Sequence, residues 1–174
     1  MVEDFEFTQA LINTFWFSLG VVIPTVVLGL IFALLLHKNF AGSQFYRAVI
    51  FSPWITPTVA VSIVWSWVFE SKSGLANQIL MSMGFDKIAW LEQGDTAMVA
   101  VIIVTIWQAI GWTMLFYISA LNKIPSSLYE ASLIDGCSSL TRFFKITLPL
   151  VSPTTFFLLV VNIINAVQAF DQFQ

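Results

Sequence analysis

This chain of 174 residues is 58% hydrophobic and only 10% charged, with a formal net charge of −3. Soluble domains carry about 25% charged residues, so this composition, with a mean hydropathy of +0.86, indicates a membrane protein. The acidic balance offers no basic surface for nucleic acid. The single cysteine and the single histidine exclude an internal disulfide and a metal site built from several such residues.

Four stretches contain no Asp, Glu, Lys, Arg or His, and each exceeds the roughly 20 residues that a helix needs to cross a bilayer. They are Phe7 to Leu36, Ala48 to Phe69, Thr96 to Asn122 and Ile146 to Phe170. We therefore expect an all-α fold: one polytopic transmembrane helix bundle over residues 1–174. The four predicted spans are 8–36, 48–69, 96–121 and 147–170.

The loops between these stretches predict an orientation. Five of the seven Lys and Arg residues lie in the first and third loops, which the positive-inside rule places in the cytoplasm. The middle loop and both ends then lie outside. Because no hydrophobic segment precedes the acidic start, we expect a fragment that lacks one span before Met1 and more chain after Gln174. The alternative is that Met1 is a true start with an unusual insertion route.

Sequence motifs of enzymes are missing. The chain has no G-x-x-x-x-G-K-[ST] phosphate-binding loop, no H-E-x-x-H and no G-x-S-x-G. The apolar stretches also lack the Asp, Glu or His relays on which proton-driven transporters run. We expect no enzymatic activity, no metal site and an energy source outside this chain, although a Na⁺ site of carbonyls and hydroxyls stays open.

Several uncharged amide side chains lie within the predicted membrane spans. Gln108, Asn162 and Asn165 are the candidates for a solute path, because an amide left without hydrogen bonds inside a membrane is costly. Asn162 and Asn165 are three residues apart and therefore share a helix face. The alternative is interhelical hydrogen bonding, worth about 0.6 kcal/mol on average.

The loop over residues 122–146 predicts a helix, a turn and a second helix. Pro125 suits a helix start, so we expect a helix over 126–134, ended by Gly136 in a left-handed conformation. Ser138 or Ser139 can cap the next helix. Pro149 kinks that helix or marks its entry into the membrane.

Two interpretations of the 126–134 helix remain open on physical grounds. Its apolar residues point in different directions rather than forming one stripe, which suits a helix held in a partner's groove. The alternative is a solvated loop in which Glu130 and Asp135 pair with Lys123 or Arg142.

The same segment resembles the EAA loop of binding-protein-dependent ABC importer permeases, whose pattern is E-A-A, then D-G-A, then F, I, L-P and a further Pro. The residues that match in register are Glu130, Ala131, Asp135, Gly136, Phe143, Ile146, Leu148, Pro149 and Pro153. Ser132 and Cys137 stand where the family has Ala. The stretches GSQFYRAVIFSPWITP, SGLANQILMSMGFDKIAWL, FFLLVVN and AFDQF are also similar to the family, in particular to its carbohydrate and glycerol-3-phosphate permeases.

The resemblance implies a multi-pass permease subunit of a bacterial or archaeal inner (plasma) membrane, in a family whose subunits usually have six spans. It implies import of sugars or related solutes such as glycerol-3-phosphate. The expected partners are a second permease, a cytoplasmic ATPase dimer that binds ATP and Mg, an extracytoplasmic solute-binding protein and the lipid bilayer. This chain itself is expected to bind no cofactor.

In this interpretation the loop over 122–146 couples ATPase motion to alternating access. The coupling residues are Tyr129, Glu130, Ala131, Ser132, Asp135, Gly136, Cys137, Phe143, Ile146, Leu148 and Pro149. The alternative functions are an ATP-independent channel or secondary carrier, and a structural membrane anchor.

Overall fold

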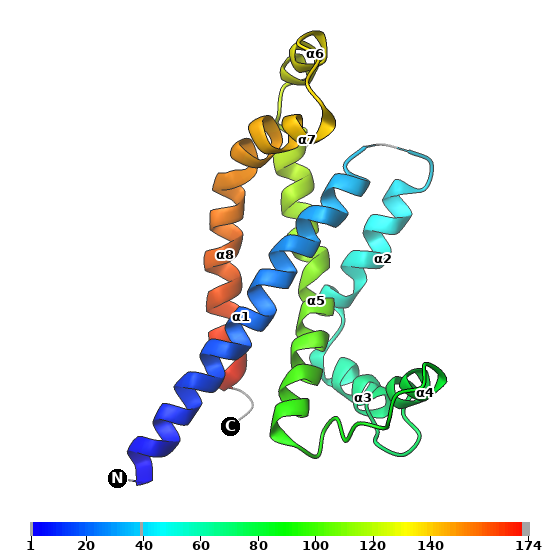
Figure 1. The fold of residues 1–174 in the computed structure, drawn as a ribbon, viewed down its shortest axis with the longest axis vertical. Helices are drawn as coiled ribbons and strands as arrows, with labels where there is room; N and C mark the ends of the chain where they lie inside the picture. The colour runs from blue at the N-terminus through cyan, green and yellow to red at the C-terminus, as the bar shows by residue number, and fades with distance from the viewer. Residues whose placement is uncertain (1, 39, 172–174) are drawn as a thin grey trace.

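The computed structural model describes residues 2–38 and 40–171, and these residues form helices without any strand (Figure 1). The remaining positions, including the end of the AFDQF stretch, lie outside the described residues. The first four helices are α1 (Val2–Leu36), α2 (Ser43–Ile55), α3 (Thr58–Val68) and α4 (Leu75–Ser82). They are followed by α5 (Gly94–Asn122), α6 (Ser126–Ile134), α7 (Ser139–Arg142), the π-helix η1 (Phe143–Thr147) and α8 (Leu148–Asp171). The all-α prediction is confirmed.

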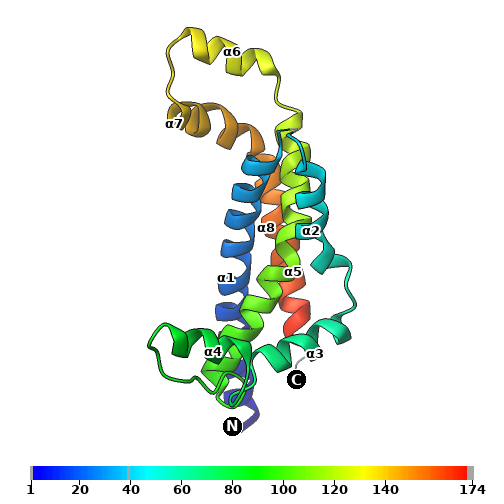
Figure 2. The same ribbon diagram turned by 90° about the vertical axis from the view of Figure 1, so that its right-hand side faces the viewer.

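Four helices form the bundle. α1 packs along α5, α8 contacts both of them, and α2 lies against α5 (Figures 1 and 2). Three helical segments are long and apolar enough to cross a membrane, namely Thr8–Leu36, Gly94–Asn122 and Ser139–Gln168. They correspond to the first, third and fourth predicted spans.

The second predicted span, over 48–69, is a bent pair of helices rather than one continuous helix. α2 ends at Ile55, α3 begins at Thr58, and the two helices are bent by 98°. Pro57 explains the break, because its ring disfavours a helical conformation at the preceding residue. Thr56 accordingly has a ψ of 132°. By length and composition, α2 and α3 together make one span at most.

The connections between the long helices lie at the two opposite ends of the bundle. α6 and α7 share one end with the connection between α1 and α2, whereas α3 and α4 lie at the opposite end (Figures 1 and 2). At the α6 end, the Arg47 Nε donates a hydrogen bond of 3.0 Å to the Leu36 carbonyl oxygen. The two loops that were predicted to be cytoplasmic therefore meet at one end of the molecule.

The core lies where α1, α5 and α8 meet, with Met114, Tyr117 and Leu158 fully buried. The contact between α2 and α5 depends on Gly111. A Cβ atom there would collide with the Ile50 carbonyl oxygen and lie 2.6 Å from Phe51 Cα. Small residues of this kind let helix backbones approach closely in membrane bundles.

Asn77 organises the segment around α4. Its side chain is fully buried and donates to the carbonyl oxygens of Ser71 and Ile88 at 3.0 and 2.9 Å. Its Oδ1 accepts from the Ile88 N–H and from the Trp90 Nε1, both at 3.1 Å. Since every hydrogen-bonding group of this amide has a partner, Asn77 serves as a structural anchor for this loop.

Candidate functional site

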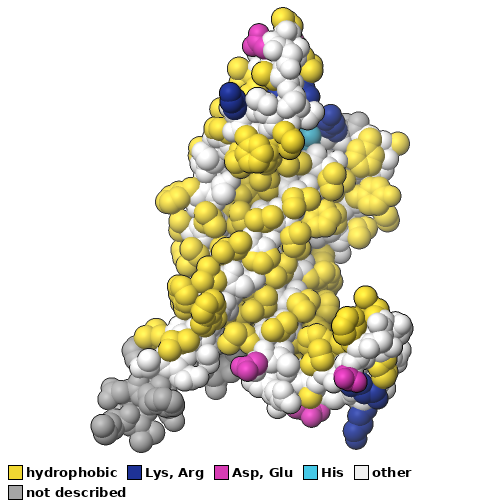
Figure 3. Space-filling view, in the orientation of Figure 1, with side chains coloured by type: hydrophobic (Ala, Val, Ile, Leu, Met, Phe, Trp, Pro, Cys, Tyr) yellow, Lys and Arg dark blue, Asp and Glu magenta, His cyan; other side chains and the backbone are white. Residues whose placement is uncertain are grey.

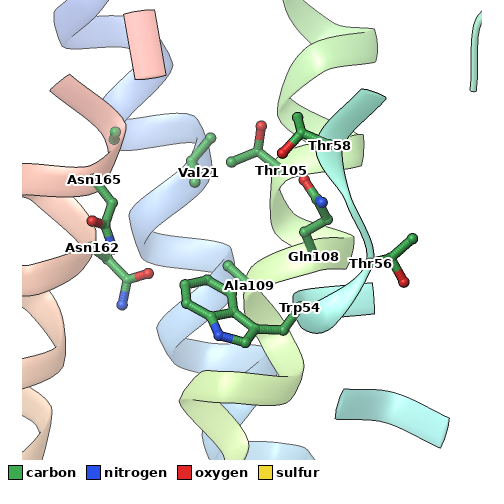
Figure 4. Close-up of a pocket in the computed structure, with 10 residues that line it drawn as sticks. Val21, Trp54, Thr56, Thr58, Thr105, Gln108, Ala109, Asn162 and Asn165 are labelled. Atoms are coloured by element: carbon green, nitrogen blue, oxygen red, sulfur yellow. The ribbon is translucent and has the colours of Figure 1, made fainter. Parts of the chain in front are cut away.

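A cavity of about 290 Å³ lies inside the bundle, beside the break between α2 and α3 (Figure 4). The three amides predicted to form a solute path all line it: Gln108 from α5, and Asn162 and Asn165 from α8. Spacing along one helix placed the two asparagines together. Gln108 lines the same cavity because α8 packs beside α5.

The amides in this cavity keep hydrogen-bonding capacity. The Asn162 Nδ2 donates 2.7 Å to the carbonyl oxygen of Leu158 in its own helix. Within the described parts of the chain, the side chains of Gln108 and Asn165 form no hydrogen bond to protein. These groups can therefore bind a polar solute, and the alternative of interhelical hydrogen bonding does not describe this conformation.

The α2–α3 break adds groups that were not among the residues predicted for the solute path. Trp54, Thr56 and Thr58 line the same cavity, and Figure 4 shows them around the broken segment. The Trp54 ring also stacks on Trp112, with the ring centroids 5.4 Å apart. Pro57 is the feature of the sequence that could have predicted these residues, because a proline within an apolar stretch marks a discontinuous helix. Discontinuous helices form binding sites in transporters.

A larger cavity of about 480 Å³ adjoins the first between α3 and α5. Thr58, Thr105 and Gln108 line both cavities. Ser62 and Ser66 continue the row of hydroxyls along α3, at intervals of four residues from Thr58. None of the described residues that line either cavity is ionisable. The two cavities together therefore have an uncharged lining, with polar side chains on part of it.

The helix predicted over 126–134 forms as α6, with those bounds. It ends in a Schellman motif: the Cys137 N–H donates to the Ser132 carbonyl oxygen at 2.9 Å, and the Gly136 N–H donates to the Leu133 carbonyl oxygen at 3.1 Å. Gly136 has a φ of +69°. The Ser138 Oγ accepts from the Thr141 N–H at 3.2 Å and caps α7. The local predictions for this loop are thus confirmed.

The side chains of α6 mostly face outward. The predicted coupling residues Glu130, Ala131 and Asp135 are exposed, as are the apolar Leu133 and Ile134, of which Ile134 is 88% exposed. Cys137 is half-buried and carries a free thiol.

The solvated-loop alternative included ion pairs that do not form among the described residues. Within the described residues, Glu130 and Asp135 make no ion pair with Lys123 or Arg142. Arg142 donates instead to the Ser139 Oγ at 3.0 Å.

Two features connect α6 to the last long helix. The hydroxyls of Tyr129 on α6 and Thr147 on η1 are hydrogen-bonded at 3.0 Å. Around Thr147 the helix widens into the π-helix η1, which includes Phe143 and Ile146, and the Leu148 N–H donates to the Phe143 carbonyl oxygen. Pro149 explains this widening, because its ring cannot donate to the backbone and crowds the turn before it.

No group of three or more His, Cys, Asp or Glu side chains that could hold a metal ion occurs within the residues that the structure describes.

Comparison with known proteins gives similarity over nearly the whole chain. A family model described as "binding-protein-dependent transport system inner membrane component" matches residues 25–172. The sn-glycerol-3-phosphate transport system permease protein UgpA of Escherichia coli O6:K15:H31 is 35% identical over 99% of this chain and 58% of its own length. The trehalose/maltose transport system permease protein MalF of Thermococcus litoralis is 36% identical over 95% of this chain and 56% of its own length. The chain thus spans less than two thirds of the length of these relatives.

The fold is also similar to that of solved structures. A chain in the crystal structure of a bacterial ABC transporter involved in the import of the acidic polysaccharide alginate superposes with a TM-score of 0.84. That match has 22% identity and covers 96% of this chain and 59% of the other. A bacterial alginate ABC transporter in complex with an alginate pentasaccharide-bound periplasmic protein gives a TM-score of 0.77 at 24% identity, over 86% of this chain and 53% of the other.

Proposed function

The chain belongs to the family of binding-protein-dependent transport system inner membrane components, and we propose that it is a permease subunit of an ATP-driven importer. Its solute is a sugar or a related compound such as glycerol-3-phosphate, which fits the substrates named for the similar permeases. ATP and Mg bind to a separate ATPase dimer, and this chain converts the motion of that dimer into alternating access.

The observation that carries this proposal is the exposure of α6. The helix stands away from the bundle at the end where the basic loops meet (Figures 1 and 3). Its apolar residues Leu128, Leu133 and Ile134 are exposed although they point in different directions. Apolar groups around a whole helix are stabilised when a protein groove surrounds that helix. A groove on the cytoplasmic ATPase provides this environment.

Force then passes from α6 to α8 through short connections. The Schellman motif at Gly136 turns the chain back sharply, so that displacement of α6 displaces α7 as well. The hydrogen bond between Tyr129 and Thr147 provides a second connection, directly to the π-helix before α8. Since π-turns bend more readily than regular helices, η1 serves as the hinge of this movement.

Movement of α8 changes the cavity of about 290 Å³ beside the α2–α3 break, because α8 contributes Asn162 and Asn165 to its wall. The amides and threonines there replace some of the hydrogen bonds that a hydroxylated solute loses when it leaves water. An extracytoplasmic solute-binding protein docks at the end that carries α3 and α4. A second permease completes the path.

The test compares two glycines with the same backbone requirement. Gly136 and Gly84 have φ angles of +69° and +85°, and a Cβ atom at either position meets nothing within 4 Å. Gly136→Leu and Gly84→Leu therefore carry similar strain, roughly 1–2 kcal/mol for a left-handed conformation. Only Gly136 lies at the α6 turn. Each variant of the full-length subunit is reconstituted into vesicles with its partner permease, ATPase and binding protein, and ATP-dependent solute uptake is measured.

We expect Gly136→Leu to abolish uptake while membrane insertion stays intact, and Gly84→Leu to retain most of the uptake. Equal uptake by the two variants would remove the coupling role from α6. Uptake that proceeds without ATP would favour the channel or carrier alternative.

A further inference from the structure

A third cavity, of about 420 Å³, lies at the α6 end of the bundle, apart from the two cavities beside the α2–α3 break. Three basic side chains line it: His37 and Lys38 follow the end of α1, and Arg142 ends α7. No carboxylate is among the described residues that line it. Lys, Arg and His residues cluster at this end of the molecule (Figure 3). The cavity therefore favours a negatively charged ligand.

The hydrogen-bonding groups in this cavity are suited to an oxyanion. Arg142 is oriented by its hydrogen bond to the Ser139 Oγ, and the guanidinium group retains further donors. The Lys38 ammonium group makes no hydrogen bond to any described residue. The Nδ1–H of His37 donates to the Leu34 carbonyl oxygen at 2.9 Å, so its Nε2 donates to an anion only when the imidazole ring is protonated. Arginine and lysine together form typical phosphate sites.

The C-terminal end of α1 does not repel an anion in this cavity. Carbonyl groups at a helix C-terminus carry partial negative charge. Here Arg47 donates from Nε and from Nη2 to the Leu36 carbonyl oxygen, and from Nη2 to the His37 carbonyl oxygen at 3.2 Å. These hydrogen bonds offset the partial charge at the cavity wall.

Beside the basic groups and the hydroxyls of Tyr129, Ser139 and Thr147, the cavity has an apolar part that lies at the expected membrane boundary. Leu34, Leu121 and Phe143 line the cavity beside the basic groups. The charge-free stretches end close by, at Leu36 and Asn122, where each helix leaves the predicted hydrocarbon region. A cavity that is basic on one side and apolar on the other fits a phospholipid headgroup with its glycerol backbone better than a fully hydrated ion.

We propose that this cavity binds a phosphate oxyanion, supplied by an anionic phospholipid of the cytoplasmic leaflet. Basic pockets between membrane helices on this side recognise such headgroups. The bound phosphate bridges Lys38 at the end of α1 to Arg142 on α7, so that the loop carrying α6 is tied to the bundle. The binding itself is independent of the transport function; its effect on coupling rests on the proposed function.

The test is a lipid titration of the purified full chain in detergent micelles, followed by native mass spectrometry. Phosphatidylglycerol is compared with the zwitterionic phosphatidylcholine, and inorganic phosphate is added as a competitor. The variants are Lys38→Gln, Arg142→Gln and the double variant. The matched control is Lys145→Gln, which removes the same charge from an exposed residue on η1 that does not line the cavity.

We expect one phosphatidylglycerol to bind in preference to phosphatidylcholine. Each single substitution should weaken its binding about fivefold and the double variant roughly 30-fold, whereas Lys145→Gln should change it by less than about twofold. Lys38 is exposed and unpaired within the described residues, so Lys38→Gln leaves the fold intact, which circular dichroism checks.

The proposal is overturned if the two lipids bind equally, or if Lys145→Gln weakens binding as much as Lys38→Gln does. Displacement of phosphatidylglycerol by millimolar inorganic phosphate overturns the lipid as the source of the anion.

Discussion

α5 and α6 are consecutive helices, yet they differ in how they use their apolar residues. α5 ends at Asn122 and α6 begins at Ser126. In α5, Met114 and Tyr117 are fully buried between neighbouring helices, whereas in α6 Ile134 is 88% exposed. Apolar content therefore does not decide burial here. It is decided by whether a helix has neighbours within this chain.

This difference separates stability from function. A substitution on α5 that disturbs packing lowers the free energy of unfolding and thereby every activity of the protein. A substitution at an exposed position of α6 leaves folding almost unchanged, since surface changes usually alter stability by about 0.5 kcal/mol or less. Such a substitution affects only the binding of α6 to a partner protein. Three substitutions test this separation.

The largest effect on stability is expected for Gly111→Ala in α5. The added methyl group meets the backbone of α2 at Ile50 and Phe51, which cannot rotate away as a side chain would. Overpacking of this kind costs about 3 kcal/mol at its upper range. Gly94→Ala is the control at the start of the same helix, where a Cβ atom meets nothing within 4 Å. Thermal unfolding in detergent micelles measures both variants, and equal melting temperatures would contradict the assigned close contact.

A smaller effect, on binding alone, is expected for Ile134→Asp in α6. The charge at this exposed position should weaken binding of the ATPase dimer at least about tenfold, which corresponds to about 1.4 kcal/mol, without lowering the melting temperature. Met83→Asp is the control, because Met83 is also well exposed but lies next to α4 at the opposite end. Co-purification and titration with the ATPase measure the change. Unchanged binding would show that α6 is not the contact surface.

The smallest effect is expected for Tyr129→Phe. Tyr129 lies on α6, and its hydroxyl connects α6 to η1 at the start of the last long helix. The substitution removes the hydroxyl that bonds to Thr147 and leaves a buried hydroxyl without this partner. We expect a loss of about 1 kcal/mol in stability and a severalfold decrease in uptake per ATP hydrolysed, with ATPase binding retained. Tyr46→Phe serves as the control at an exposed tyrosine of α2. A variant that transports as efficiently as the wild type would exclude this hydrogen bond from the coupling route.

Local rules predicted the loop over 122–146 closely. The helix start after Pro125, the left-handed Gly136 and the Ser138 cap all depend on neighbours within a few residues. The π-helix over 143–147 was not foreseen. Pro149 indicated a disturbance there, but a kink, a break and a π-turn all satisfy the missing backbone donor.

The second span shows the limit of hydropathy. Residues 48–69 are apolar enough for one crossing, and composition alone gives no angle between their two halves. Pro53 and Pro57 are four residues apart, yet the chain stays helical around Pro53 and is extended at Thr56 before Pro57. The packing of α2 against α5 through Gly111 keeps the first half in the bundle.

Composition and short-range geometry were enough to predict the membrane class, the apolar stretches, the basic loops at one end and the capped α6 helix. The packing of the helices was needed to show which helix faces are buried and that Gln108 lines one cavity with Asn162 and Asn165. This division follows from the solvent around the helices. In a membrane, side chains that face lipid and side chains that face protein are both apolar, so the periodic contrast that marks the inner face of a soluble helix is lost.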